Sequence, residues 1–268
     1  MPETVGRPTV ADLRARKARG EKLTMVYVET EDEACAAAAA GVDMLSIAAP
    51  RWSPAMRAAA GSCFVQIGLL YGELCTAGDY LRAAHAAMQN GGDCVYCAAA
   101  LDIQKLLGDN AIPVVGHVGL IPSQATWTGG FKAVGKTAAS AREVWDHVTR
   151  LEQIGCFGAE IEVVPDRVAE VVARNSGLLL LGMGAGPHTD AQYLFTEDLL
   201  GYGRTRAPRH AKVYRDFATE FARLHQERTA AFSEFVADVA SGAYPACDHA
   251  VPIEDAAFDA FLDGLDPR

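Results

Sequence analysis

The sequence lacks several features that mark particular classes of protein. No apolar run reaches the roughly 18 residues that a transmembrane helix needs. The first residues, Met1-Pro-Glu-Thr-Val5, do not show the charged and then apolar order of a secretory signal peptide. Internal repeats and low-complexity linkers are also missing. We therefore expect a cytoplasmic protein.

Basic residues are in deficit. The chain of 268 residues has 24 Lys and Arg against 34 Asp and Glu, a formal net charge of −10. A surplus of negative charge repels the phosphates of nucleic acids and of anionic lipids, so we expect neither nucleic acid nor membrane as a partner. With 50% hydrophobic residues the chain can bury a large core, and we expect a single domain over residues 1–268.

The seven cysteines are an odd number, scattered along the chain in mostly apolar surroundings. This pattern favours reduced thiols packed as small hydrophobes over disulfides. Only Cys94-Val-Tyr-Cys97 has a CxxC spacing. No second pair completes a zinc site and no helix start follows to activate a thiol, so core packing is favoured over a redox or metal role.

Short apolar runs alternate with longer amphipathic segments, as in repeated βα units around a parallel sheet. An eighth run lies near Tyr193-Leu-Phe195, and eight units predict a (β/α)8 TIM barrel. From Ala207 the pattern becomes helical, and we expect 207–268 to form C-terminal helices that cap the barrel or serve oligomerisation. The first seven expected strands are 23–29, 44–49, 63–69, 94–99, 112–118, 159–164 and 178–184.

Active sites of (β/α)8 barrels form at the C-terminal ends of the strands, so polar residues at those ends are candidates. Gly184 lies in the run Gly182-Met-Gly-Ala-Gly186, which lacks the spacing of a dinucleotide fingerprint but lets a ligand or strand come close. His117 either donates to a substrate carbonyl or bonds to a neighbouring strand's backbone. The other candidates are Tyr27, Glu29, Gln66, Tyr96 and Glu162.

Two carboxylates stand one residue apart in the apolar run 158–165. Alternate side chains of a strand share a face, so Glu160 and Glu162 point the same way. Burying an unpaired carboxylate costs several kcal/mol or keeps the group protonated. The pair therefore needs water, partners or a chemical role.

Five motifs in register carry a family resemblance. The motifs are Gly116-His-Val-Gly-Leu-Ile-Pro122, Gly129-Gly-Phe-Lys-Ala-Val-Gly135, Ile161-Glu-Val-Val-Pro165, Gly182-Met-Gly-Ala-Gly186 with Thr189-Asp-Ala-Gln192, and Ser241-Gly-Ala-Tyr-Pro245. With these motifs the sequence resembles the ketopantoate hydroxymethyltransferase (3-methyl-2-oxobutanoate hydroxymethyltransferase) family over nearly its whole length.

The resemblance implies a barrel of the phosphoenolpyruvate mutase and isocitrate lyase superfamily, commonly assembled as a decamer. It implies transfer of a one-carbon unit from 5,10-methylenetetrahydrofolate to the enolate of a 2-oxo acid held by magnesium. The proton-abstracting glutamate of the family falls on Glu162, and its substrate-contacting histidine falls on His117.

The sequence departs from the family at the metal site. Ala49 and Pro50 stand where the family has a metal-binding aspartate and a serine, and Gly68 stands where it has a second aspartate. The run Tyr96-Cys-Ala-Ala-Ala100 replaces a family motif that holds a lysine and another carboxylate. Magnesium prefers oxygen ligands, which alanine and glycine side chains do not offer. We therefore expect no metal; an alternative metal site would have to use Gln66 or Glu29.

These observations give one preferred hypothesis. We expect an enzyme with Glu162 as base, His117 and Tyr96 as polarising groups, and a small-molecule carbonyl substrate other than the usual 2-oxo acid. The alternatives are a carbon–carbon lyase, a decarboxylase or a hydrolase on the same scaffold, or a non-catalytic homologue. We expect Glu160 to find a partner or stay protonated. Further substrate-binding residues are predicted at Tyr27, Gln66, Glu160 and Gly184.

Overall fold

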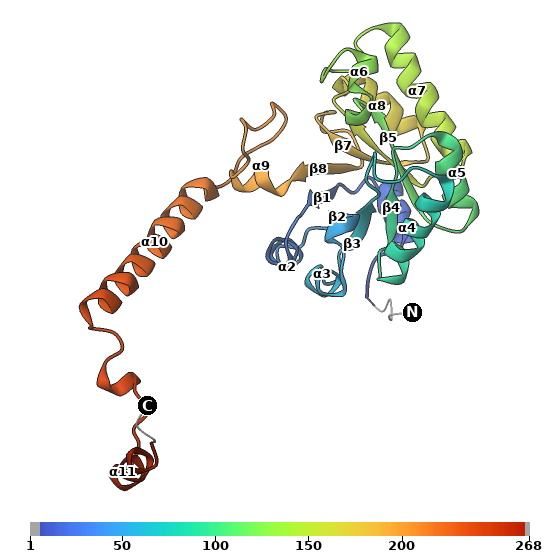
Figure 1. The fold of residues 1–268 in the computed structure, drawn as a ribbon. Helices are drawn as coiled ribbons and strands as arrows, with labels where there is room; N and C mark the ends of the chain where they lie inside the picture. The colour runs from blue at the N-terminus through green and yellow to red at the C-terminus, as the bar shows by residue number, and fades with distance from the viewer. Residues whose placement is uncertain (1–5, 266–268) are drawn as a thin grey trace. The chain divides into compact units, whose positions relative to one another are not determined.

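A computed structural model describes residues 6–265, so the residues Met1–Val5 considered above lie outside it. Eight parallel strands close into a barrel in sequence order, and β8 pairs with β1 (Figure 1). This confirms the (β/α)8 barrel and the positions of all eight expected strands. They are β1 (Leu23–Tyr27), β2 (Met44–Ala48), β3 (Phe64–Gly68), β4 (Cys94–Tyr96), β5 (Val114–Gly119), β6 (Gly158–Glu162), β7 (Leu179–Met183) and β8 (Ala191–Phe195).

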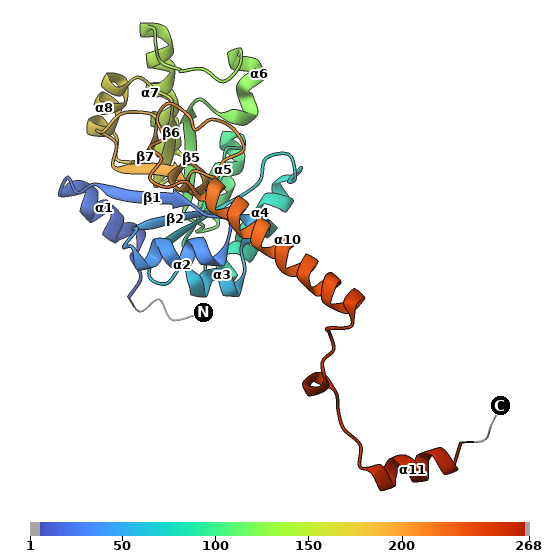
Figure 2. The same ribbon diagram turned by 90° about the vertical axis from the view of Figure 1, so that its left-hand side faces the viewer.

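Helices surround the strands (Figures 1 and 2). Capping boxes fix several of them; in one, the Thr30 side chain accepts from Glu33 N–H and the Glu33 side chain accepts from Thr30 N–H. Short 3-10 turns follow β2 and β5, at Ala49–Arg51 and Pro122–Gln124. The helices are α1 (Val10–Ala18), α2 (Glu31–Ala39), α3 (Pro54–Ala59), α4 (Ala77–Gln89), α5 (Leu101–Asp109), α6 (Ala125–Thr128), α7 (Ala138–Gln153), α8 (Asp166–Asn175) and α9 (Thr196–Leu200).

The core has two layers because alternate residues of each strand face opposite sides. On β6, Ala159 and Ile161 point outward into the layer between strands and helices. Inside the barrel, Phe64 and Phe157 pack edge to face, and Leu13 of α1 packs with them. Cys94 lies in the inner layer and Cys97 in the outer one, both as buried free thiols. Burial raises the pKa of Cys97 to about 11, which keeps this thiol protonated and unreactive.

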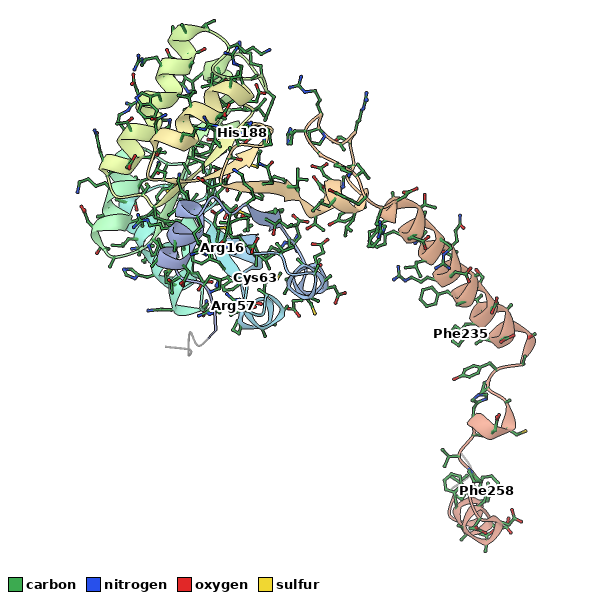
Figure 3. The ribbon with its side chains drawn as sticks, turned by 180° about the vertical axis from the view of Figure 1, so that it is seen from behind. Arg16, Arg57, Cys63, His188, Phe235 and Phe258 are labelled. Atoms are coloured by element: carbon green, nitrogen blue, oxygen red, sulfur yellow. The ribbon has the colours of Figure 1, made fainter. Side chains whose placement is uncertain are left out.

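The chain divides into two compact units: the first ends at Arg215 and the second begins at Asp216. From the sequence we expected a single domain. The second unit holds α10 (Phe217–Ser241), a 3-10 turn (Cys247–His249) and α11 (Asp255–Asp263). Figure 3 shows Phe235 and Phe258 projecting from these helices, and both are exposed.

The C-terminal helical pattern begins later than the sequence predicts. Residues 207–216 form no helix, and α10 begins at Phe217. Pro208 explains part of the difference, because proline has no N–H donor and disfavours the helical conformation of the residue before it. Among the residues that the structure describes, no helix combines the length and apolar character needed to cross a membrane.

Candidate active site

A cavity of about 300 Å³ opens at the C-terminal ends of the strands, the end at which (β/α)8 enzymes place their chemistry. It draws residues from most of the strands. The residues that line it are Tyr27, Ser46, Ala48, Gly68, Leu69, Leu70, Tyr71, Tyr80, Tyr96, Ala98, Ala99, His117, Pro122, Ser123, Glu160, Glu162, Met183, Tyr193 and Phe195.

A larger cavity, of about 1070 Å³, lies outside the barrel and is lined from α7, α8 and the segments before them. Exposed Lys136, Arg142 and Arg167 line it, with Trp145 on its wall. It contains one carboxylate, Glu170, which already pairs with Arg174 at 2.7 Å. Because the larger cavity lacks the paired acids and the histidine found at the barrel mouth, the smaller cavity is the candidate active site.

Glu162 stands at the end of β6, and the local backbone fixes its position. Opposite it on β5 lies Gly119, which has a φ of +87°, a conformation that glycine adopts at little cost. A Cβ on Gly119 would lie 2.3 Å from the carbonyl oxygen of Glu162, so the two strand ends approach closely. The next residue, Val163, has a φ of +48°, a strained conformation for a β-branched side chain. Backbone hydrogen bonds to Met183 and Val134 hold Val163 there.

His117 lies between the two glutamates and is almost completely buried. Its Nε2 lies 2.8 Å from the carbonyl oxygen of Leu120 and 3.3 Å from Glu162 Oε2. A carbonyl oxygen only accepts, so Nε2 carries a hydrogen. In the neutral ring Nδ1 must then accept, and it takes the hydroxyl proton of Tyr96 at 2.7 Å. Nδ1 also lies 3.5 Å from Glu160 Oε2.

Glu160 lies two residues before Glu162 on β6, deeper in the barrel, and it has the partners expected for a buried carboxyl group. Its Oε1 accepts a hydrogen bond from Gln66 Nε2 at 2.8 Å. Burial raises the pKa of Glu160 to about 7, and the nearby Glu162 adds to this, while His117 and Gln66 act in the opposite direction. A carboxyl group with such a pKa exchanges protons near neutrality.

Gln66 is itself fully buried at the floor of the site. Its Nε2 also donates to Ser46 Oγ at 3.2 Å. Its Oε1 has no hydrogen-bond partner among the described residues. An unpaired buried oxygen costs about 1–3 kcal/mol, so it is open to a donor such as water or the protonated Glu160 after rotation of the amide.

Aromatic rings form the walls of the cavity. The Tyr27 and Phe195 rings lie 5.0 Å apart, and Phe195 stacks on Tyr193 at 5.6 Å. Tyr96 meets His117 edge to face. Burial, followed by the nearby Glu160, raises the pKa of the Tyr96 hydroxyl well above its usual range. Tyr96 therefore acts at neutral pH as a hydrogen-bond donor and not as a phenolate.

The structure brings together most of the residues that the sequence singles out. One cavity is lined by Glu162, His117, Tyr96, Tyr27 and Glu160. Gln66 lies behind this lining and donates a hydrogen bond to Glu160.

Besides Gln66, two further sequence candidates lie outside the cavity lining. The backbone of Gly184 packs against the His210 ring, where an added Cβ would lie 2.9 Å from Nδ1. Glu29 accepts a hydrogen bond from the Tyr27 hydroxyl at 3.3 Å.

Sequence reasoning missed Ser46, Tyr71, Tyr80, Tyr193 and Phe195 as lining residues. A signal for Ser46 was present, because it lies two residues from Met44 and so shares its inward face. The same spacing relates Tyr193 to Phe195. Tyr71 follows the end of β3 in a loop, where no alternation applies.

The described residues contain no group of three or more His, Cys, Asp or Glu side chains placed to hold a metal ion. Of the two residues compared with metal ligands on sequence grounds, Ala49 begins the turn after β2 and Gly68 ends β3. Neither side chain has an oxygen to offer.

Comparison with known proteins identifies the family. The family model described as ketopantoate hydroxymethyltransferase matches residues 50–247. The 3-methyl-2-oxobutanoate hydroxymethyltransferase of Nitratidesulfovibrio vulgaris is 36% identical over 164 residues, which are 61% of this chain and about half (51%) of that protein. The enzyme of the same name from Thermus thermophilus is 32% identical over 267 residues, covering 91% of this chain and 99% of its own.

Solved structures agree on the fold. A 2,3-dimethylmalate lyase of the phosphoenolpyruvate mutase and isocitrate lyase superfamily superposes with a TM-score of 0.50 at 13% identity, covering 95% of this chain and 98% of its own. At this identity the likeness concerns the fold alone. Fold, motifs and family match agree, and the chain belongs to the ketopantoate hydroxymethyltransferase family of transferase enzymes.

Proposed function

We propose that this protein removes a proton from the carbon next to a substrate carbonyl and joins a one-carbon unit to the resulting enolate, by hydroxymethyl transfer or related aldol-type chemistry. The observation that carries the proposal is Glu162 at the cavity, with its side chain 17% exposed and its Oε2 3.3 Å from His117 Nε2. A carboxylate that is accessible to substrate and oriented by a neighbouring donor suits a general base.

The neighbouring residues supply the donors that an enolate needs. As Glu162 takes the carbon-bound proton, negative charge develops on the substrate oxygen. Protonated Glu160 can pass its proton to His117 Nδ1, whose N–H then donates to the Tyr96 oxygen. This turns the Tyr96 hydroxyl proton toward the enolate oxygen. One such preorganised donor is worth about 10²–10³ in rate.

We propose 5,10-methylenetetrahydrofolate as the one-carbon donor, which when bound would supply carbon at the oxidation level of formaldehyde: bonds to the enolate carbon and to a water oxygen would replace the two bonds of this carbon to folate nitrogens, and tetrahydrofolate would leave. The cavity of about 300 Å³ is small, so the folate must approach from its mouth. Tyr71 lines this cavity and is 68% exposed, and we assign its ring to stack on the flat pterin.

We propose that the chemistry needs no magnesium, because the donor set does not fit this ion. Mg²⁺ takes octahedral oxygen ligands and is usually held through carboxylates. Of the two carboxylates in the cavity, Glu160 already accepts from Gln66, and Glu162 lies beside His117. Ala49 and Gly68 provide none.

We also propose a cytoplasmic homo-oligomer, with the decamer of the family as the expected form. On α10, Phe232, Val236 and Val239 are 70%, 65% and 50% exposed at i, i+4 and i+7 spacing. Such an apolar stripe favours contact with another copy. Light scattering on the purified protein gives the mass of the assembly, and a monomer at micromolar concentration would contradict this part of the proposal.

The function is tested by supplying tetrahydrofolate, formaldehyde and a panel of carbonyl compounds. The expected result is a product heavier by one CH₂O unit, formed only when both the folate and the carbonyl compound are present. Calorimetric titration with tetrahydrofolate discriminates against a lyase or a hydrolase, since neither needs this ligand. Absence of folate binding together with cleavage of a panel member would contradict the proposal.

A further inference from the structure

We infer that the substrate of this site is an uncharged carbonyl compound, a ketone or amide with an apolar or aromatic body, and that it carries no carboxylate next to the carbonyl. This assignment rests on the proposed function and names its substrate class. It follows from the charge, the walls and the size of the cavity.

The cavity offers no cation. Among the described residues that line it there is no lysine or arginine, and its charged groups are Glu160 and Glu162. His117 also faces it, but both ring nitrogens are engaged, by Leu120 and Tyr96. A substrate carboxylate would face the Glu162 carboxylate, and that of Glu160 whenever it is ionised, without a lysine or arginine in the lining as counter-ion, and close like charges in a poorly hydrated site repel strongly.

The other basic residues of the barrel lie outside the cavity lining; Arg51, in the turn after β2, interacts electrostatically with Tyr27 but is exposed. Arg204, Arg206 and Arg209 follow α9, but they are exposed and do not line the cavity. Lys132 lies on the loop after α6, with its Nζ beside Gly129 of the same loop. It is exposed and does not line the cavity.

The walls fit an apolar or aromatic body. Six rings line a cavity of about 300 Å³, at the small end of the range for ligand sites. Their hydroxyls are largely occupied: Tyr27 donates to Glu29, Tyr96 to His117, and Tyr193 hydrogen-bonds Ser46. The surface left for the ligand is mainly ring faces and aliphatic groups, which bind flat apolar groups. The rings are Tyr27, Tyr71, Tyr80, Tyr96, Tyr193 and Phe195.

Small residues keep the remaining wall open. Ala48, Gly68, Ala98 and Ala99 line the cavity together. A Cβ on Gly68 would meet its nearest neighbours at 3.7–4.0 Å, which is ordinary contact. The fold therefore does not require glycine at this position, and the missing side chain leaves room for an uncharged substrate.

The test uses three matched compounds: 3-methyl-2-oxobutanoate, its amide 3-methyl-2-oxobutanamide, and the aryl ketone 2-methyl-1-phenylpropan-1-one. All have one hydrogen on the carbon beside the carbonyl. Its exchange for deuterium is followed by NMR, and each rate is divided by the rate in buffer alone. We expect the amide and the aryl ketone to be accelerated at least about tenfold more than the oxo acid, a difference of about 1.4 kcal/mol.

A pair of variants changes the charge of the wall. Ala98→Lys adds a cation to the cavity, and Ala98→Met adds a side chain of similar length without charge. We expect Ala98→Lys to shift the preference at least about tenfold toward the oxo acid and Ala98→Met to leave the order unchanged. Faster exchange of the oxo acid than of both neutral compounds by the unmodified protein would contradict this inference alone. No exchange with any of the three would contradict the proposed function as well.

Discussion

Replacing Glu160 with glutamine should remove a large part of the pH dependence of stability. Burial raises the pKa of Glu160 from its ordinary value of 4.5 to about 7 in the folded protein. Between these two values the folded chain binds a proton that the unfolded chain has lost. The free energy of unfolding must therefore fall as the pH rises from 4.5 through 7.

The size of this effect follows from the shift. The difference between 7 and 4.5 is 2.5 pKa units, and at 1.36 kcal/mol per unit this gives about 3 kcal/mol over the full range. About 2–3 kcal/mol of it falls between pH 5 and pH 8. Glutamine keeps the shape of Glu160 and an oxygen for Gln66, but it does not titrate.

The assay is urea unfolding of the unmodified protein and of Glu160→Gln at pH 5, 6, 7 and 8 and constant ionic strength. Contributions from titrating groups that lie far from Glu160 cancel in the difference between the two proteins. That difference should move by about 2–3 kcal/mol in favour of the variant between pH 5 and pH 8. Glu73→Gln, at an exposed position, is the control and should show no such trend. Parallel pH profiles for the protein and Glu160→Gln would refute the reasoning.

Three further outcomes follow. Tyr96→Phe keeps the ring but removes the hydroxyl that hydrogen-bonds His117. Deuterium exchange at the substrate carbon beside the carbonyl should slow by about 10²–10³, with unchanged circular dichroism. Gly119→Ala should cost more than about 2 kcal/mol in urea unfolding, since its Cβ would meet the Glu162 carbonyl, whereas Gly20→Ala, also at positive φ, meets nothing within 4 Å and should cost less. Dialysis against EDTA should leave activity unchanged, and dependence on added magnesium would contradict the proposed metal-free site.

The alternation of short apolar runs with longer amphipathic segments was enough to predict the barrel. Each strand is a short apolar run, and only the ends moved: β1 ends at Tyr27 and β4 at Tyr96, both before the expected boundaries. Runs such as 23–29 include apolar residues after the last strand residue, because Val28 is still buried against the outer layer. Apolar character records burial, and it does not mark where the ladder of hydrogen bonds stops.

The polar members of the candidate site on β4, β5 and β6 were predictable, whereas most of its aromatic walls and the connections between its residues were not. Because alternate residues of a strand share a face, Glu160 and Glu162 were expected on the same face, and the family motif indicated Glu162 as the base. The contact of Glu160 with Gln66 joins residues far apart in sequence across the barrel, and only the three-dimensional closure brings them within 2.8 Å. The tautomer of His117 likewise depends on the Leu120 carbonyl, which no residue pattern reveals.

Deuterium exchange by Glu162→Gln tests the central claim most directly. Glutamine retains the size of the side chain but cannot take a proton, so exchange at the carbon beside the carbonyl should fall by about 10²–10⁴. Circular dichroism and urea unfolding serve as the fold control. If Glu162→Gln exchanges its substrate as fast as the unmodified protein, Glu162 is not the base and the proposed mechanism is wrong.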